Sequence, residues 1–177
     1  MKFDFKNVIK RTMAVSMVVL SVCMLTGCAS FAKKKALYEY ANSLSSDAAS
    51  WQALQTTMNQ MNSTSDPKLM VSYAKVALEY LEKVKDSAVD RNKGITDPEI
   101  KDIDDSYVEA VTKMYNGYKM MIEGVEEYDQ KKLDTGSAEL ENGAQSLKDY
   151  ITKMQDFCDK YNIPADDKLQ EALDLLD

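Results

Sequence analysis

The sequence predicts an all-α protein: an antiparallel four-helix bundle with a short C-terminal helix, preceded by a cleaved signal peptide. Apolar residues recur at steps of three and four along almost the whole chain after residue 36, which is the period of an amphipathic helix. Glycine and proline are scarce, with 6 and 3 in 177 residues, so a loop-rich β-sandwich is excluded. A chain of this length suits a single domain.

The first helix is expected to begin near residue 37 and to continue to about residue 58. Its apolar stripe consists of Leu37, Ala41, Leu44, Ala48, Trp51, Leu54 and Met58. The serine-rich stretch 43–47 has poor helix propensity, so this helix is either continuous or divided into two pieces. In the divided form, Ser46 or Asp47 caps the second piece.

The second and third helices each begin with a capping residue placed before a proline. Ser65-Asp66-Pro67 and Thr96-Asp97-Pro98 have this pattern, since proline suits the first helical turn. The second helix is expected to end at 92–94. Its stripe is Leu69, Tyr73, Val76, Tyr80 and Val84. The stripe of the third helix is Ile100, Ile103, Tyr107, Val111, Met114, Tyr118, Met121, Val125 and Tyr128.

The fourth helix follows a turn expected at Leu133–Gly136. Its stripe is Leu140, Ala144, Leu147, Ile151, Met154, Cys158 and Tyr161. Steps that average 3.5 residues keep this stripe facing a neighbouring helix, as in bundles. Pro164 then starts a short terminal helix with Leu169, Leu173 and Leu176 on one face.

Glycines at seven-residue intervals predict close packing of the third and fourth helices. Gly117 and Gly124 are seven apart, as are Gly136 and Gly143. Because each costs a helix interior about 1 kcal/mol, a compensating close contact is expected. Folding the chain about residue 133 brings Gly124 near Gly143 and places Tyr150 over Gly117. Alternatively, the glycines lie by chance on exposed flanks.

The N-terminus has the plan of a secretory leader. Residues 1–11 contain four basic side chains and one acid, and an apolar run follows at Met13–Leu25. This order is typical of a signal peptide. The run is shorter than the roughly 20 apolar residues that a membrane-spanning helix needs. An uncleaved membrane anchor remains the alternative.

The end of the leader, Leu25-Thr26-Gly27-Cys28, resembles the lipobox of bacterial lipoproteins. The resemblance implies lipidation of the Cys28 thiol and cleavage between Gly27 and Cys28. It divides the chain into a signal peptide (1–27), a lipidated membrane-proximal neck (28–36) and a bundle domain (37–177). The alternative is an ordinary signal peptide cut nearby, for example after Ala29. By analogy, alanine at position 29 favours the outer membrane if the organism has one.

Charge separates the neck from the body. The whole chain has 22 basic and 29 acidic side chains, a net charge of −7. An acidic protein lacks the basic face that nucleic acids require, so no nucleic-acid partner is expected. Lys33, Lys34 and Lys35 directly follow the predicted anchor. They either attract an anionic lipid surface, at about 1 kcal/mol each, or form a solvated helix start.

Few residues point to catalysis or to metal binding. The chain has no histidine, which removes the commonest general base and transition-metal ligand. Cys158 lies on an apolar stripe, which indicates a buried side chain rather than a reactive thiol. The acidic run at 99–105 lacks the pattern of an EF-hand loop, so we interpret it as favourable charge at a helix N-terminus. We expect no metal, no cofactor and no enzymatic activity.

Ten tyrosines and 11 methionines leave two functions open. The first is a lipid-anchored protein of the cell envelope whose non-catalytic bundle binds an envelope protein or has a structural role. The alternative is a small-molecule-binding module that uses a Tyr/Met-lined interior, because buried tyrosine hydroxyls need polar partners.

Overall fold

The structure is a computed structural model that describes residues 31–163, and every regular element in that range is helical. The elements in order are α2 (Phe31–Leu44), the 3₁₀ turn η3 (Ser45–Asp47), α3 (Ala48–Ser63), α4 (Pro67–Gly94), α5 (Pro98–Glu127) and α6 (Gln130–Lys160). The predicted leader, Cys28 and the terminal helix expected from Pro164 lie outside the described residues.

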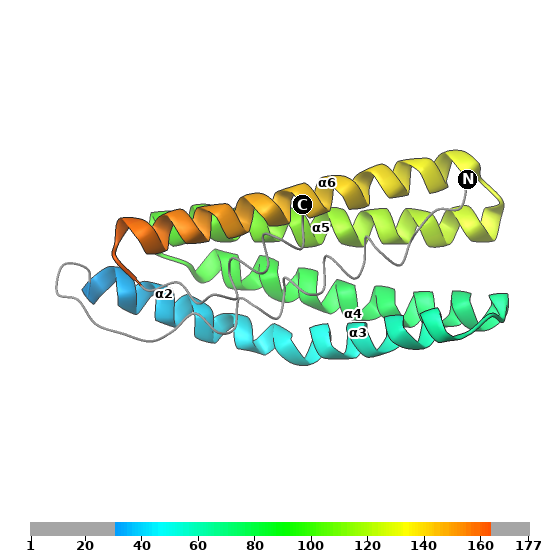
Figure 1. Ribbon diagram of the computed structural model, residues 1–177, viewed down its shortest axis with the longest axis horizontal. Coiled ribbons are helices and arrows are strands. Elements are labelled where there is room, and N and C mark those ends of the chain that lie inside the picture. Colours follow the sequence, from blue (N-terminus) through cyan, green and yellow to red (C-terminus); the bar gives the residue numbers. More distant parts are fainter. Residues whose placement is uncertain (1–30, 164–177) are drawn as a thin grey trace.

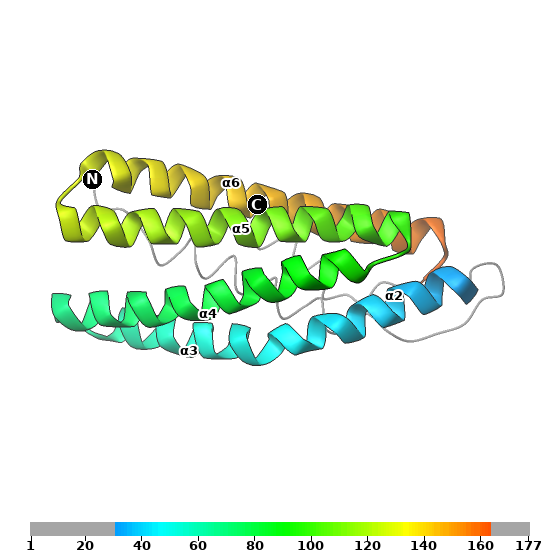
Figure 2. The same cartoon turned by 180° about the vertical axis from the view of Figure 1, so that it is seen from behind.

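Four helices pack together, which confirms the predicted helical bundle. α2, η3 and α3 form one bent rod, α4 returns alongside α3, and the α5–α6 hairpin packs against this pair (Figures 1 and 2). One end, the near end, contains the start of α2, the α4–α5 loop and the end of α6. The opposite far end contains the α3–α4 and α5–α6 turns.

The predicted starts of α4 and α5 are confirmed in their chemistry as well as their position. The Asp66 carboxylate accepts a hydrogen bond from the Lys68 amide at the start of α4. The Asp97 carboxylate accepts hydrogen bonds from the Glu99 and Ile100 amides at the start of α5. Each carboxylate therefore pairs amides that the first helical turn leaves without partners.

The first helix is divided, as the serine-rich stretch allowed. The α-helix gives way to a 3₁₀ turn at Ser45–Asp47 and resumes at Ala48. Asp47 makes no capping hydrogen bond, so the capping role considered for it is wrong. Its carboxylate is 2 % exposed and faces α4 instead. α2 begins at Phe31, inside the segment 28–36 that is predicted to form the neck.

The core follows the predicted stripes of the first, third and fourth helices, with exceptions at the far end. Val125 is 49 % exposed and Tyr128 is 96 % exposed, although both continue the stripe of α5. Tyr128 lies beyond the helix in a left-handed conformation (φ 56°), and its amide donates to the Gly124 carbonyl. The stripe therefore extends past the point where other helices cover it.

The stripe predicted for α4 is confirmed at Val84 and wrong at Leu69 and Val76. Leu69 and Val76 are exposed, whereas the buried residues are Ala77, Leu81, Val84 and Ala88. Two apolar stripes overlap on this helix. The one rich in alanine faces the core because small side chains let neighbouring helices approach.

The turn before α6 is also misplaced in the prediction. It lies at Tyr128–Asp129 rather than at Leu133–Gly136, and Gly136 is inside α6. Asp129 caps α6, since its carboxylate accepts a hydrogen bond from the Lys132 amide. The sequence at this turn contains neither glycine nor proline, which are the residues that usually mark a turn.

Glycines lie where the α5 and α6 backbones approach each other. A Cβ atom added to Gly117 would be 2.6 Å from the Gly136 carbonyl oxygen and 2.9 Å from the Leu140 amide nitrogen. One added to Gly124 would be 2.9 Å from the Leu133 side chain. Farther from the α5–α6 turn, Gly143 lies against Met114 and the Ala110 carbonyl. A Cβ atom at Gly117 would meet backbone atoms of α6, and one at Gly124 or Gly143 would require neighbouring atoms of the other helix to shift.

The predicted partners of these glycines are wrong because the turn is about five residues earlier than expected. Gly124 does not face Gly143, and Tyr150 does not lie over Gly117. Tyr150 instead contacts Tyr107, with 5.3 Å between ring centroids, and is fully buried.

Candidate functional site

The centre of the near half contains a buried charge cluster, which we define as Asp47, Arg91 and Asp104. The Arg91 guanidinium lies 2.6 Å from the Asp47 carboxylate and 3.1 Å from the Asp104 carboxylate. The exposed fractions of the three side chains are 2 % for Asp47, 7 % for Arg91 and 0 % for Asp104. Together they join the α2–α3 break, α4 and α5.

Neutral hydrogen-bond donors complete the cluster. The Tyr40 hydroxyl donates to one Asp104 oxygen at 2.9 Å, and the Asn92 amide donates to the other at 3.0 Å. The Ser87 hydroxyl donates to Asp47. Each carboxylate oxygen thus has a partner, as buried charges require.

Arg91 keeps its charge in this environment. Burial by itself lowers the pKa of Arg91, but the attraction of Asp104 and then the smaller effects of Tyr40 and Asp47 outweigh it, so the pKa is raised. The guanidinium carbon also lies 5.1 Å from the Tyr107 ring centroid and 5.8 Å from that of Tyr40. The cluster holds one cation against two carboxylates.

Trp51 and four tyrosines are buried in the core near the cluster or farther along the bundle. The tyrosines are Tyr40, Tyr107, Tyr118 and Tyr150. The Trp51 indole donates to the Tyr107 hydroxyl at 3.0 Å, and the Tyr40 hydroxyl lies 3.4 Å from that of Tyr150. Farther along the bundle, the Tyr118 hydroxyl lies 3.3 Å from the Met58 sulfur. These contacts identify Trp51 as a core residue.

We predict that the buried tyrosines resist ionisation until the protein unfolds. Burial raises the pKa of Tyr40, Tyr107, Tyr118 and Tyr150 above the usual 10. A raised folded-state pKa means that stability is complete below about pH 10 and falls as the pH rises toward the folded-state value. An alkaline titration of phenolate absorbance should leave four of the ten tyrosines unionised while helicity persists.

In denaturant, all ten should titrate together. Ionisation of every tyrosine near pH 10 with the helical signal intact would contradict the prediction.

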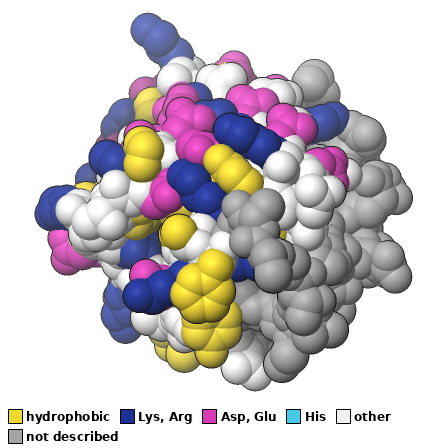
Figure 3. All heavy atoms as spheres, turned by 90° about the vertical axis from the view of Figure 1, so that its left-hand side faces the viewer, with side chains coloured by type: hydrophobic (Ala, Val, Ile, Leu, Met, Phe, Trp, Pro, Cys, Tyr) yellow, Lys and Arg dark blue, Asp and Glu magenta, His cyan; other side chains and the backbone are white. Residues whose placement is uncertain are grey.

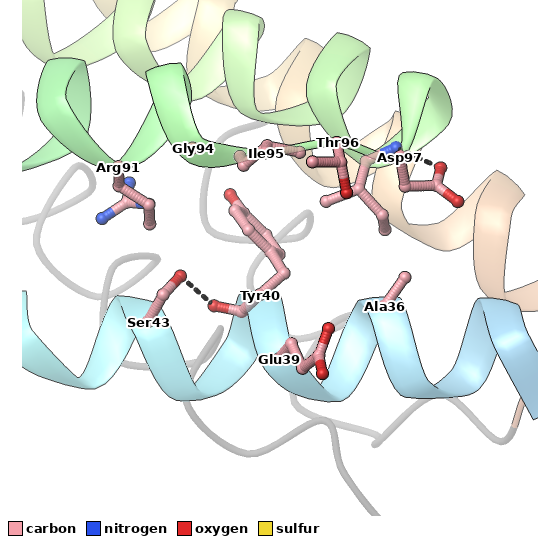
Figure 4. A pocket seen from close by; sticks show the side chains of 10 residues that line it. Ala36, Glu39, Tyr40, Ser43, Arg91, Gly94, Ile95, Thr96 and Asp97 are labelled. Atoms are coloured by element: carbon pink, nitrogen blue, oxygen red, sulfur yellow. Dashed lines mark hydrogen bonds between the residues drawn. The ribbon is translucent and has the colours of Figure 1, made fainter.

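A pocket of about 300 Å³ lies beside the cluster, between α2 and the α4–α5 loop. Figure 4 shows the Tyr40 side chain extending from α2 toward this loop, with Arg91 to one side. Besides Tyr40 and Arg91, the residues that line the pocket include Ala36, Glu39, Ser43, Ile95, Thr96, Asp97 and Ile100. The pocket therefore combines apolar side chains with acidic ones, and its volume is at the lower limit for small-molecule sites.

A second polar cluster, the near-end clamp, joins three helices: Lys33, Asp97, Glu99, Lys160 and Tyr161. Lys33 lies 2.7 Å from the Asp97 carboxylate and 2.9 Å from that of Glu99. The ammonium of Lys160 lies 2.8 Å from Glu99, and the Tyr161 hydroxyl donates to Glu99 at 2.7 Å. The clamp ties the first turn of α2 to the start of α5 and the end of α6.

We predict that acid weakens the near-end clamp. Hydrogen bonds from Lys160, Tyr161 and Lys33, in that order, lower the pKa of Glu99 from 4.5 to about 2. A lowered folded-state pKa gives stability above about pH 4.5 that is lost as the pH falls toward 2. The free energy of unfolding should fall in this window, and Glu99→Gln should make the curve flatter.

The matched control is Glu79→Gln, because Glu79 is an exposed side chain of α4. An acid profile that Glu99→Gln changes no more than Glu79→Gln would refute this role of the clamp.

Exposed apolar side chains gather at the opposite end of the bundle. We define the far-end apolar surface by its members on α4 and at the end of α5: Leu69, Met70, Val76, Val125 and Tyr128. Their exposed fractions range from 37 % to 96 %. Ion pairs between Lys75 and Glu126, at 2.5 Å, and between Lys132 and Glu127, at 2.9 Å, flank this surface. At the near end, basic and acidic side chains are interspersed with apolar ones (Figure 3), and Phe31 is 79 % exposed.

The structure revises the roles expected for the acidic residues and agrees with the placement of Cys158. Cys158 is fully buried, as its stripe position predicted. Asp104 does not supply favourable charge at a helix terminus, because it is buried against Arg91. Within residues 31–163, no group of three or more potential ligand side chains is placed to hold a metal ion. No helix in that range is both long and apolar enough to cross a bilayer.

Sequence reasoning missed the buried charge cluster, although a signal for Arg91 was present. Arg91 continues the true core stripe of α4, three residues after Ala88. A charged residue in line with buried positions indicates a buried ion pair. Its partners are 44 and 13 residues away, so periodicity alone does not identify them.

Comparison of the chain with protein families, with curated proteins and with solved structures finds no match.

Proposed function

We propose that this chain is a lipid-anchored protein of the cell envelope, outside the cytoplasm, whose non-catalytic helical bundle binds a protein partner or has a structural role. The observation that carries the proposal is the sequence Leu25-Thr26-Gly27-Cys28, which directly follows a positively charged and then apolar leader. Acyl chains on Cys28 would provide stable attachment, because each buried methylene contributes about 0.8 kcal/mol. The start of α2 at Phe31, three residues after Cys28, is compatible with this arrangement.

The test is the chemistry of the mature N-terminus. We expect mass spectrometry of the protein from the membrane fraction of a lipoprotein-producing bacterial host to find a chain that begins with acylated Cys28. The Cys28→Ser variant should keep its leader or appear without lipid. A wild-type chain that retains residues 1–27, or that begins with an unmodified thiol, would refute the anchor.

The far-end apolar surface supports partner binding over a purely structural role. Exposed apolar side chains grouped in one region are typical of protein interaction sites. A photo-crosslinking residue at position 128 should give one reproducible protein adduct in cells, and Val125→Lys should abolish it. The same residue at position 93, at the near end, is the control. A wild-type chain without an adduct at position 128 would favour the structural role.

The pocket beside Tyr40 favours a second candidate function, the binding of a small molecule. Its volume of about 300 Å³ and its mixed lining would suit a compact ligand with a polar group. Ala36→Trp would fill the pocket from α2. If the pocket is used, a metabolite that raises the melting temperature of the wild type should have no effect on this variant.

A further inference from the structure

We propose that the near end of the bundle rests on the headgroup surface of the anchoring bilayer and that the rod stands upright on it. This inference rests on the proposed lipid anchor at Cys28. In this arrangement the lipid surface contacts the near end, and the far end lies about one bundle length above the membrane.

The tether between lipid and bundle is short. Only Ala29 and Ser30 separate Cys28 from Phe31, the first residue of α2. Three residue steps span about 10 Å even when fully extended. Any anchored arrangement therefore keeps the start of α2 within about 10 Å of the headgroups.

The near-end clamp prevents the tether from lengthening by unwinding α2. Lys33 is paired with both Asp97 and Glu99, so the first turn of α2 is fixed to α5. Glu99 is held in turn by Lys160 and Tyr161 of the α6 end. In the sequence, only residues 29 and 30 therefore separate Cys28 from this fixed turn.

Charge favours an upright rod over one lying on its side. Residues 31–163 contain 17 basic and 23 acidic side chains, so this part of the chain is negatively charged overall. Electrostatic forces at a membrane extend about 8–10 Å at physiological salt. A rod on its side brings most of this net negative charge within that distance of an anionic surface. An upright rod brings only the charges of its near end, where Lys33 and Lys160 are paired with carboxylates.

Phe31 fits the same orientation. Its side chain is 79 % exposed at the start of α2, next to the anchor. Aromatic side chains of this kind gain free energy at the boundary between headgroups and acyl chains. At the other end, α5 has 30 residues and is about 45 Å long, so the far-end apolar surface lies well beyond the reach of membrane charge.

The test measures energy transfer from two positions to acceptor-labelled lipids. Full-length protein is processed in cells, and the lipidated product is placed in vesicles of phosphatidylcholine with about one third phosphatidylglycerol, the anionic lipid that this inference requires. Donor dyes are attached through Tyr128→Cys at the far end or Lys93→Cys at the near end. Cys158 is fully buried and Cys28 is acylated, so the introduced thiol is the one available for labelling.

We expect transfer from position 128 to be at least tenfold slower than from position 93, because the two positions differ in height by most of the length of α5. The double variant Asp97→Ala/Glu99→Ala removes both carboxylates that hold Lys33 and should raise transfer from position 128 several-fold. The control variant Glu79→Ala should not.

Two failures are distinguishable. Equal transfer from both positions in protein that floats with the vesicles would overturn the upright orientation and leave the anchor standing. Protein that does not float with the vesicles would overturn the anchor, and the orientation with it.

Discussion

Replacing Arg91 with leucine should destabilise the protein by about 3–5 kcal/mol, because it leaves two buried carboxylates without their cation. Asp47 and Asp104 are 2 % and 0 % exposed, so water does not compensate for the lost charge. Urea denaturation followed by circular dichroism measures the loss. The Lys93→Leu variant is the matched control, since Lys93 lies in the same helical turn with a side chain that is 70 % exposed.

A double-mutant cycle separates the lost attraction from lost packing. With leucine at position 91, Asp104→Asn should restore stability, whereas in the wild type the same change should reduce it. If Arg91→Leu costs no more than Lys93→Leu, the buried charge cluster does not exist as described.

The Gly117→Ala variant should lose about 1–3 kcal/mol of stability, although a glycine-to-alanine exchange in a helix usually increases stability. In an ordinary helix interior, alanine is about 1 kcal/mol more favourable than glycine. Here the added methyl group would lie 2.6 Å from the Gly136 carbonyl oxygen, and backbone atoms cannot turn away as a flexible side chain can. Denaturation by urea and by heat should both report the loss.

Gly94→Ala is the matched control, because no atom lies within 4 Å of the methyl group that it would add. That variant should keep the wild-type stability or gain slightly. An unchanged or higher melting temperature for Gly117→Ala would show that α5 and α6 are not in close contact at this level.

Periodicity predicted the fold class because burial of an apolar stripe is what makes each helix stable. It was less reliable on α4, where Val76 and Ala77 belong to adjacent stripes. Hydropathy favours the larger side chain, whereas close packing favours the smaller one. The tertiary contact decides between them, and a single sequence does not contain it.

The errors at the α5–α6 turn and at the charge cluster have separate causes. Tyr128 adopts a left-handed conformation that is uncommon for residues other than glycine, so no ordinary turn signal marks the position. A shift of this turn changes every pairing along the hairpin, and for that reason the glycine partners were wrong. Arg91 meets Asp47 only after α4 has packed against the α2–α3 break, which no local pattern encodes.

The buried charge cluster also determines how the molecule comes apart. Arg91 holds together segments that are distant along the chain. If one of these segments detaches, a charge remains in the protein interior without its partner. Partial opening of the near half is therefore costly, and unfolding should be cooperative, with one transition for all spectroscopic probes. A protein with this property would resist proteases up to the temperature at which the whole molecule melts, and would then be degraded abruptly.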